Sequence, residues 1–320
     1  MLGYALMMIP VLAACSGASL PAGDASGGPT APDTVVVTRG SHTDAAGTRG
    51  YRLALPAHTQ AQMQSQAQAP GAESRGPLLV MLHGCTQVAD DIALGTRMDA
   101  LAGARGVAVL YPEQDPGAHP LRCWNWYEPA HQGRGAGEPA ILAGMIQEVL
   151  ETHGLDPDRV FVAGMSAGGA MAAILSATYP ELVAGMASHS GVPFGVAPGL
   201  SAATAAMSGS LEVDPAAAAE AVRSARGTHD RPIPLLVIHG EDDAVVSPRN
   251  AEWFQAQGLR LLAPGLAPGL SDLVRVVVVP GLGHAWSGGD PEGTYTDPRG
   301  PDASRMILDF FLDAPRAGDR

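Results

Sequence analysis

The chain has 320 residues, of which 46% are hydrophobic and 16% charged, and its formal net charge is −13. This composition indicates a globular protein with a sizeable core and excludes an intrinsically disordered chain. The acidic balance argues against a nucleic-acid-binding protein, because phosphates attract clusters of Lys and Arg. The length fits one large domain or two small ones.

The first residues have the character of an export signal. Residues 1–15 carry no charge and are mostly apolar, over a length too short to span a bilayer. The segment LAAC, ending at Cys15, resembles a bacterial lipobox, whose cysteine carries lipid after cleavage. We predict a lipoprotein-type signal peptide over residues 1–14, a lipid on Cys15 as the sole membrane attachment, and a place in the cell envelope. An ordinary signal peptide, with a periplasmic or secreted product, is the alternative.

The rest of the chain divides by composition. Residues 15–33 are rich in Gly, Ala, Pro and Ser, which favours a flexible tether. We expect one folded domain over residues 34–315 and a short tail over 316–320. Within the domain, residues 194–230 form an Ala-, Gly- and Ser-rich insertion with helical character over residues 213–225. It either covers a site as a lid or lies passively on the surface. Residues 60–76, rich in Gln and Ala, are expected to form a mobile loop.

Segments of strand and helix character alternate along this domain. Strands are predicted over residues 34–38, 51–55, 78–82, 107–111, 160–163, 183–188, 235–239 and 274–279, and helices over 89–104, 138–152, 168–179, 248–257 and 302–312. Several strands are continuous apolar runs, as in parallel strands covered on both faces. The alternation predicts an α/β fold with a mostly parallel sheet flanked by helices. No helix separates the first two strands, so an antiparallel hairpin is expected at the N-terminal edge.

Ser166 lies in the pattern G-x-S-x-G, between a predicted strand and a predicted helix. Gly164 and Gly168 would relieve contacts around a sharp turn that holds the serine in a rare backbone conformation. The following helix would point its first N–H groups at charge that develops near the hydroxyl. This context favours a nucleophile elbow. Taken alone, the pattern also fits a small residue where a strand packs tightly against a helix.

A serine nucleophile needs a base, and the base needs an orienting carboxylate. Where a nucleophile elbow is used, the chain order is serine, acid, histidine. This chain supplies Asp243 and His284 in that order, each just after a predicted strand, at the edge where open α/β sheets place their sites. We predict Ser166, Asp243 and His284 as a catalytic triad, with Asp242 as the alternative acid.

An acyl-transfer site also needs two N–H donors for the oxyanion. The backbone amide of Ala167 is predicted to supply one, and that of Cys85, in the loop HGCTQ after strand 78–82, the other. His83 and His239 also end strands and are expected to hydrogen-bond the loops that shape the site. A zinc site built from these histidines lacks tight ligand spacing, so we predict no metal and no cofactor.

The chain contains three cysteines, Cys15, Cys85 and Cys123. With Cys15 lipidated, the other two form an even pair in an oxidising compartment, and a disulfide between them is predicted. The alternative is two buried free thiols. A Cys85–Cys123 bond would fix the loop that carries the second oxyanion donor.

Five motifs in order carry a family resemblance: LLVMLHGCTQ, CWNWY, DPDRVFVAGMSAGGAM, VIHGEDDAVV and GLGHAWSGG. Together they resemble the polyhydroxybutyrate depolymerase-type esterases of the α/β-hydrolase superfamily, over about residues 35–315. The resemblance implies an α/β-hydrolase fold, the same triad, and an ester substrate such as a hydroxyalkanoate oligomer or polymer. The family also includes feruloyl and acetylxylan esterases, which supply the alternative substrates. A peptidase and a non-catalytic binding protein on the same fold are weaker alternatives.

Three tryptophans, Trp124, Trp126 and Trp286, lie within these motifs. Trp286 is two residues after His284, and the other two alternate along CWNWY. We predict that the three rings line a substrate pocket; core packing is the alternative. Apolar ring surface suits a hydroxyalkanoate chain and an aromatic acyl group equally, so these residues do not choose between the substrate classes.

Overall fold

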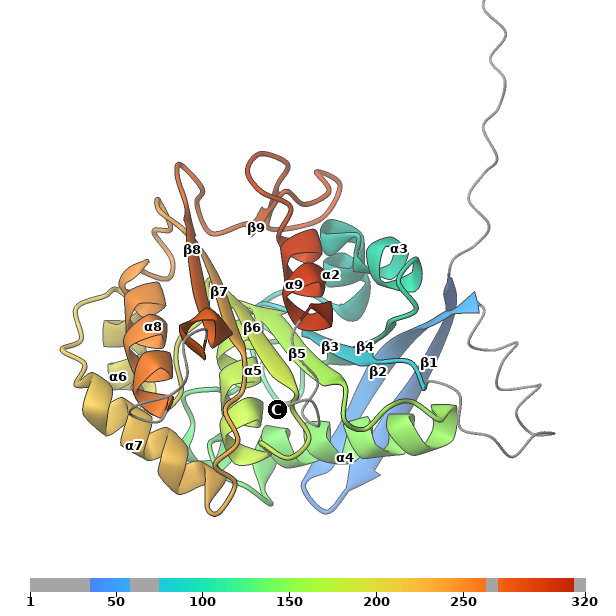
Figure 1. Ribbon diagram of the computed structural model, residues 1–320, viewed down its shortest axis with the longest axis horizontal. Helices are drawn as coiled ribbons and strands as arrows, with labels where there is room; N and C mark the ends of the chain where they lie inside the picture. The colour runs from blue at the N-terminus through green and yellow to red at the C-terminus, as the bar shows by residue number, and fades with distance from the viewer. Residues whose placement is uncertain (1–34, 58–74, 263–269, 314–320) are drawn as a thin grey trace, which may run out of the picture. The chain divides into compact units, whose positions relative to one another are not determined.

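The central feature of this computed structural model, which describes residues 35–57, 75–262 and 270–313, is one eight-stranded sheet (Figure 1). From edge to edge its strands are β1 (Val35–Asp44), β2 (Gly47–Pro56), β4 (Ala108–Glu113), β3 (Leu78–Leu82), β5 (Val160–Met165), β6 (Gly185–His189), β7 (Leu235–Gly240) and β8 (Val274–Val279). From β4 to β8 neighbouring strands are parallel, whereas β1 and β2 form an antiparallel hairpin. The predicted α/β fold with an antiparallel edge hairpin is confirmed.

Helices cover both faces of the sheet (Figure 1). One core contains residues of α2 (Ala89–Thr96), α3 (Met98–Gly103) and α9 (Ala303–Leu312). The other contains residues of α4 (Gly137–His153), α5 (Ala167–Thr178), α6 (Leu200–Met207), α7 (Pro215–Arg226) and α8 (Arg249–Leu261). Two short 3-10 helices, Pro129–His131 and Leu270–Leu273, and a small parallel pair, β9 (Trp286–Ser287) with β10 (Thr296–Asp297), complete the described elements.

Strand β3 explains the continuous apolar runs seen in the sequence. All five of its residues are buried. Leu78, Val80 and Leu82 belong to the core on one face, and Leu79 and Met81 to the core on the other. Successive side chains of a strand point to opposite faces. A strand that is covered on both faces therefore shows no alternation of polar and apolar residues in its sequence.

The predicted helix over 89–104 is wrong in one respect, because it is two helices. Arg97 has φ of 53°, in the left-handed region, and separates α2 from α3. Its guanidinium donates to the carbonyl oxygen of Gly288 at 2.6 Å and to Asp302 at 3.1 Å. Gly288 and Asp302 are 191 and 205 positions away from Arg97, so contacts with distant parts of the chain accompany the interruption of the helix.

The predicted helical character over residues 213–225 is confirmed by α7. Asp214 precedes this helix and accepts the N–H of Ala216 at 2.8 Å, and Pro215 occupies its first position. Both features favour a helix start. The short helix α6 was not predicted.

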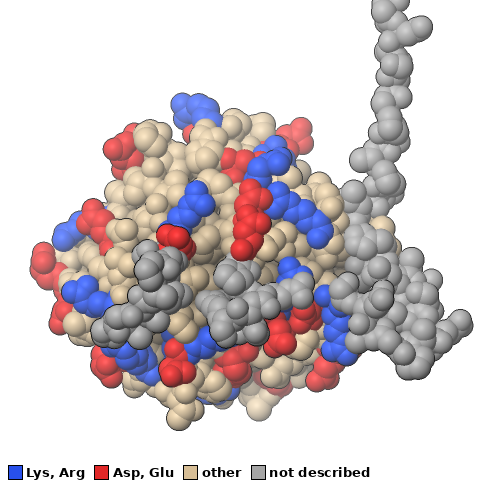
Figure 2. Space-filling view, in the orientation of Figure 1, with Lys and Arg blue, Asp and Glu red and all other residues tan. Residues whose placement is uncertain are grey.

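Several predictions fall outside the described residues. These are the signal peptide, the lipid on Cys15, the tether, the tail over 316–320 and most of the loop over 60–76. None of the helices in the described ranges is long and apolar enough to cross a membrane. On the described part of the face in Figure 2, basic and acidic side chains are interspersed and are not gathered by sign.

Candidate active site

The backbone at Ser166 adopts the turn that its sequence motif predicts. Ser166 lies between β5 and α5 with φ of 55° and ψ of −120°, a costly conformation for a residue with a side chain. A Cβ atom at Gly164 would lie 2.4 Å from the carbonyl carbon of Gly168, and one at Gly168 would lie 2.1 Å from the carbonyl oxygen of Leu82. Both glycines are therefore needed for α5 to start so close to β5 and β3.

Asp243 and His284 are in direct contact at the carboxyl ends of β7 and β8. Asp243 Oδ2 lies 2.7 Å from His284 Nδ1. Asp243 Oδ1 accepts the amides of Val245 at 3.0 Å and Val246 at 2.8 Å, and the residue is only 5% exposed. Asp242, the alternative acid, is exposed, and its side chain makes no hydrogen bond with the described residues. The structure therefore places Asp243 against the histidine.

The electrostatics of this pair fix the histidine's orientation. Burial by itself would raise the pKa of Asp243, but the hydrogen bond and charge of His284 and the amides of Val245 and Val246 outweigh it, so the pKa is lowered. The carboxylate is thus ionised at neutral pH and accepts the Nδ1–H of His284. The opposite nitrogen, Nε2, is left to exchange a proton with another group.

His189, at the end of β6, connects the serine turn to the histidine loop. Its carbonyl oxygen accepts the N–H of Ser166 at 2.9 Å, and its ring Nε2 accepts the N–H of Ser287 at 3.2 Å. The ring also stacks on Trp286 with centroids 4.9 Å apart. An amide can only donate, so the ring proton is on Nδ1, which lies 3.2 Å from the hydroxyl oxygen of Ser190.

His189 was not among the predicted site residues. Burial, with His239 and His284 nearby, lowers its pKa to about 3, so the ring is neutral. A signal was available, because His189 follows a predicted apolar strand just as His83 and His239 do.

His83 and His239 hydrogen-bond loops at the same edge of the sheet, as predicted. His83 Nε2 accepts the N–H of Gln114 at 3.1 Å, so its Nδ1–H donates to the carbonyl oxygen of Gly84 at 2.8 Å. His239 Nε2–H donates to the carbonyl oxygen of Val246 at 2.8 Å. Burial lowers the pKa of both rings, that of His83 to about 4. In the described ranges, no group of three or more His, Cys, Asp or Glu residues is arranged to hold a metal ion.

The two predicted oxyanion donors lie on segments that adjoin the elbow. Ala167 is the first residue of α5, where amides have no partner within the helix. Gly84 places the other loop against the nucleophile, since a Cβ there would lie 3.6 Å from Ser166 Cβ. Among the described residues, the amide of Cys85 donates to no protein acceptor. Both amides are therefore available to a bound group.

The loop of Cys85 is tied down by a disulfide. The predicted bond between Cys85 and Cys123 is present, and it links two segments separated by 38 positions. The amide of Thr86 also donates to the carbonyl oxygen of Leu121 at 2.6 Å. Two connections thus join the predicted oxyanion loop to residues 121–123, where CWNWY begins.

A buried carboxylate, Glu138, fixes the other side of that segment. It is fully buried and accepts the amide and the side-chain Nδ2 of Asn125, both at 2.7 Å. It also accepts Gln114 Nε2 at 2.5 Å and Arg49 Nη2 at 3.3 Å, and the same Gln114 nitrogen donates to the carbonyl oxygen of Cys123 at 2.8 Å. Glu138 was not predicted as a structural centre, because Asn125 and Arg49 lie 13 and 89 positions away from it in the sequence.

The three tryptophans are buried. Trp124 is 0% exposed and donates its indole N–H to the carbonyl oxygen of His83 at 3.1 Å. Trp286 is 1% exposed and donates to the hydroxyl of Ser304 at 3.1 Å. Trp126 is 7% exposed and lines a small cavity with Phe194 and Val192. These contacts are those of core packing, the alternative considered from sequence; a substrate-binding role for the rings stays a prediction.

The insertion over 194–230 is joined to two loops near the site. The amide of Gly199 donates to the carbonyl oxygen of Tyr127 at 2.8 Å. The carbonyl oxygen of Met207 accepts the amide N–H of Ser247 at 2.7 Å. The carbonyl oxygen of Ala206 accepts the side-chain Nδ2 of Asn250 at 2.9 Å. The segment therefore connects CWNWY with the loop after Asp243. Its action as a lid stays a prediction.

The family described as esterase PHB depolymerase matches residues 65–269, more than half of the chain. The chain belongs to this esterase family. Poly(3-hydroxyalkanoate) depolymerase C of Paucimonas lemoignei is 32% identical over 246 residues, which cover 71% of this chain and 57% of that protein. Feruloyl esterase B of Thermothelomyces thermophilus is 29% identical over 201 residues, covering 59% of this chain and 68% of that protein.

Solved structures show the same fold. The acetyl xylan esterase from Aspergillus awamori has a TM-score of 0.67 at 20% identity, and the superposition covers 87% of this chain and 100% of the acetyl xylan esterase chain. The S-formylglutathione hydrolase from Staphylococcus aureus has a TM-score of 0.56 at 16% identity, covering 87% and 99%. At these identities the likeness concerns the fold, which is that of the α/β-hydrolases. The chain spans 57% of the Paucimonas depolymerase and 49% of the Coprinopsis cinerea acetylxylan esterase.

Proposed function

We propose that this protein is a serine esterase that hydrolyses carboxylic esters through an acyl-enzyme. The contact between Asp243 Oδ2 and His284 Nδ1, 2.7 Å apart at the sheet edge that also carries the strained turn of Ser166, is the observation that carries the proposal. Membership of a family whose named relatives are esterases and depolymerases supports the ester bond as the target.

The proposed reaction has two halves. His284 Nε2 takes the proton of the Ser166 hydroxyl as its oxygen attacks the ester carbonyl, and Asp243 stabilises the resulting imidazolium. The amides of Ala167 and Cys85 bind the oxyanion. His284 then gives the proton to the departing alcohol. Water, activated by the same imidazole, attacks the acyl group on Ser166, and the carboxylic acid leaves.

A matched pair of aspartate variants tests this assignment. Asp243→Asn removes the carboxylate that orients His284, and kcat for a p-nitrophenyl ester should fall by about 10³- to 10⁴-fold. Asp242→Asn changes the exposed neighbour and should leave kcat within about twofold of the wild-type value. Equal effects of the two substitutions would contradict the proposed roles.

For the acyl group, we propose hydroxyalkanoate oligomers or polymer. The Paucimonas depolymerase aligns with 71% of this chain at 32% identity, whereas the Thermothelomyces feruloyl esterase aligns with 59% at 29%. A feruloyl or acetylxylan esterase is the second candidate, supported by the Thermothelomyces feruloyl esterase at 29% identity and the Coprinopsis cinerea acetylxylan esterase at 32%. The buried tryptophans do not separate the two classes.

A substrate panel separates these candidates. Trimeric 3-hydroxybutyrate, polymer film, methyl ferulate and acetylated xylan should be compared by kcat/KM, with Ser166→Ala as the blank for each. Preference for the hydroxybutyrate trimer supports the first candidate. A higher kcat/KM for methyl ferulate or acetylated xylan would replace it with the second.

We also propose that the protein is exported and anchored by lipid at Cys15. The apolar start of the chain supports export, and the Cys85–Cys123 disulfide suits an oxidising compartment. In a bacterial host that expresses the full chain, the protein should incorporate labelled palmitate and sediment with membranes. Cys15→Ser should lose both properties, and unchanged labelling of that variant would refute the anchor.

A further inference from the structure

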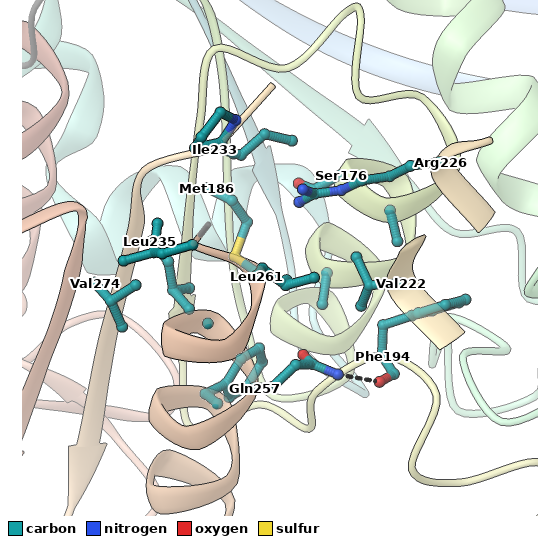
Figure 3. Close-up of a pocket in the computed structure, with 16 residues that line it drawn as sticks. Ser176, Met186, Phe194, Val222, Arg226, Ile233, Leu235, Gln257, Leu261 and Val274 are labelled. Carbon is teal, nitrogen blue, oxygen red and sulfur yellow. Dashed lines mark hydrogen bonds between the residues drawn. The ribbon is translucent and has the colours of Figure 1, made fainter. Parts of the chain in front are cut away.

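A cavity lies at the opposite ends of the strands from Ser166. Met186, Leu235 and Val274 line it near the first residues of β6, β7 and β8, whereas the proposed triad follows the last residues of its strands. Helices α5, α7 and α8 contribute the remaining walls (Figure 3). The cavity volume is about 40 Å³, which corresponds to roughly three water molecules. The site is therefore small and separate from the proposed catalytic centre.

Arg226, the last residue of α7, brings a positive charge into this apolar lining. In Figure 3 its guanidinium points inward on the side of Ser176. The residue is half-buried, and its Nε is buried without a hydrogen-bond partner. No acidic side chain of the described ranges forms an ion pair with it. Burial, together with the charges of Arg231 and Arg223, lowers its pKa to about 10.

A positive charge without an acidic partner, beside apolar walls, indicates the chemistry of the ligand that would fit the cavity. Removing a guanidinium from water is unfavourable unless an anion approaches it, and a carboxylate matches its planar donors. The other walls are mostly apolar, with Met186, Leu235 and Val274 among them. The lining also contains Ser176 and Gln257, whose hydroxyl and amide nitrogen already donate to the carbonyl oxygens of Ala172 and Phe194, both at 2.8 Å. The ligand that satisfies both parts has one carboxylate and a short aliphatic tail.

We propose that this cavity is a binding site for a short-chain carboxylate, with the carboxylate on Arg226 and the tail between Met186, Leu235 and Val274. The volume limits the ligand to about four carbons without movement of the walls. The proposal does not rest on the catalytic role of Ser166. Butyrate is the probe, and its neutral amide, butyramide, has nearly the same shape without the charge.

Titration calorimetry of the full chain tests the charge requirement. Butyrate should bind in the millimolar range, as expected for a ligand of six heavy atoms, and butyramide should bind at least about tenfold more weakly. Ser166→Ala should bind butyrate with unchanged affinity, because its substitution lies at the other end of the strands. Equal affinity for the two probes, or no binding of butyrate, would overturn the proposal.

Two arginine variants test the residue. Arg226→Gln keeps much of the side-chain length and should weaken butyrate binding by at least about tenfold. Arg223→Gln, an exposed neighbour on the same helix, should change it by less than about threefold. Equal losses in the two variants, or sulfate competing as well as butyrate, would overturn the proposal, since neither Arg226 nor the apolar lining would then select the ligand. Circular dichroism before titration establishes that both variants are folded.

Discussion

The ring Nε2 of His189 accepts the backbone N–H of Ser287 at 3.2 Å. His189 ends β6, and the neighbouring strand β5 leads into the turn of Ser166. The bond therefore joins this part of the sheet to Ser287, three residues after His284. The carbonyl oxygen of His189 accepts the N–H of Ser166 at 2.9 Å. One buried residue therefore positions both sides of the proposed proton transfer.

His189→Phe tests this positioning role. The phenyl ring can still stack on Trp286, but it offers no acceptor, so the N–H of Ser287 loses its partner. The free energy of unfolding should fall by about 1–3 kcal/mol. Because His284 loses its support, kcat should fall while KM changes little. Urea denaturation and ester hydrolysis measure the two effects; a variant with wild-type kcat would contradict the role.

Stability should depend on pH because buried histidines are neutral. Burial lowers the pKa of His83 to about 4 and of His189 to about 3, from 6.5 in the unfolded chain. Above about pH 6.5 neither state binds these protons. As the pH falls below that value, only the unfolded chain takes them up, and the free energy of unfolding should fall by up to about 1.4 kcal/mol per pH unit for each ring.

Urea denaturation from about pH 8 to about pH 5 measures this dependence. The free energy should be level in the upper part of the range and should decline below about pH 6.5. A constant value through the whole range would show that these rings titrate equally in both states.

The disulfide should affect both stability and turnover. In the double variant Cys85→Ala and Cys123→Ala, the free energy of unfolding should fall by about 2–4 kcal/mol, since the closed loop constrains the unfolded chain. The backbone amide of Cys85 remains, but its loop loses a connection, so kcat should fall more than KM rises. Thermal denaturation and hydrolysis kinetics test this. If the double variant is less stable but kcat is unchanged, the disulfide stabilises the fold without positioning the oxyanion loop.

Glu138 offers a sharp comparison with another acid on α4. Glu138→Ala removes the acceptor of the Asn125 amide and leaves Arg49 without a carboxylate, so the free energy of unfolding should fall by about 3 kcal/mol or more. Glu151→Ala, on the exposed side of the same helix, should change it by less than about 0.5 kcal/mol. Similar losses in the two variants would refute the importance of the buried network.

The sheet and the proposed triad could be predicted because their signals are local. Gly164 and Gly168 flank the serine within five residues, and Asp243 and His284 follow buried apolar runs. Asp243 was predicted over Asp242 from its place in the loop, and the structure adds the physical difference between the two aspartates: Asp243 is buried and contacts His284.

Other features were out of reach because their causes are distant in sequence. Arg97 interrupts a helix-forming segment while its side chain binds Gly288 and Asp302, on loops near the other end of the chain. Trp124 and Trp286 lie beside functional motifs, yet their indole N–H groups bond to interior partners. Proximity in sequence does not reveal on which side of a loop a ring packs.

The most direct test of the central claim is covalent labelling of Ser166. A fluorophosphonate probe should label the wild-type protein at Ser166, as located by peptide mass spectrometry, and should abolish hydrolysis of p-nitrophenyl esters in proportion to labelling. Ser166→Ala should be folded, unlabelled and inactive. Hydrolysis retained by Ser166→Ala, or labelling at a different residue, would contradict the account.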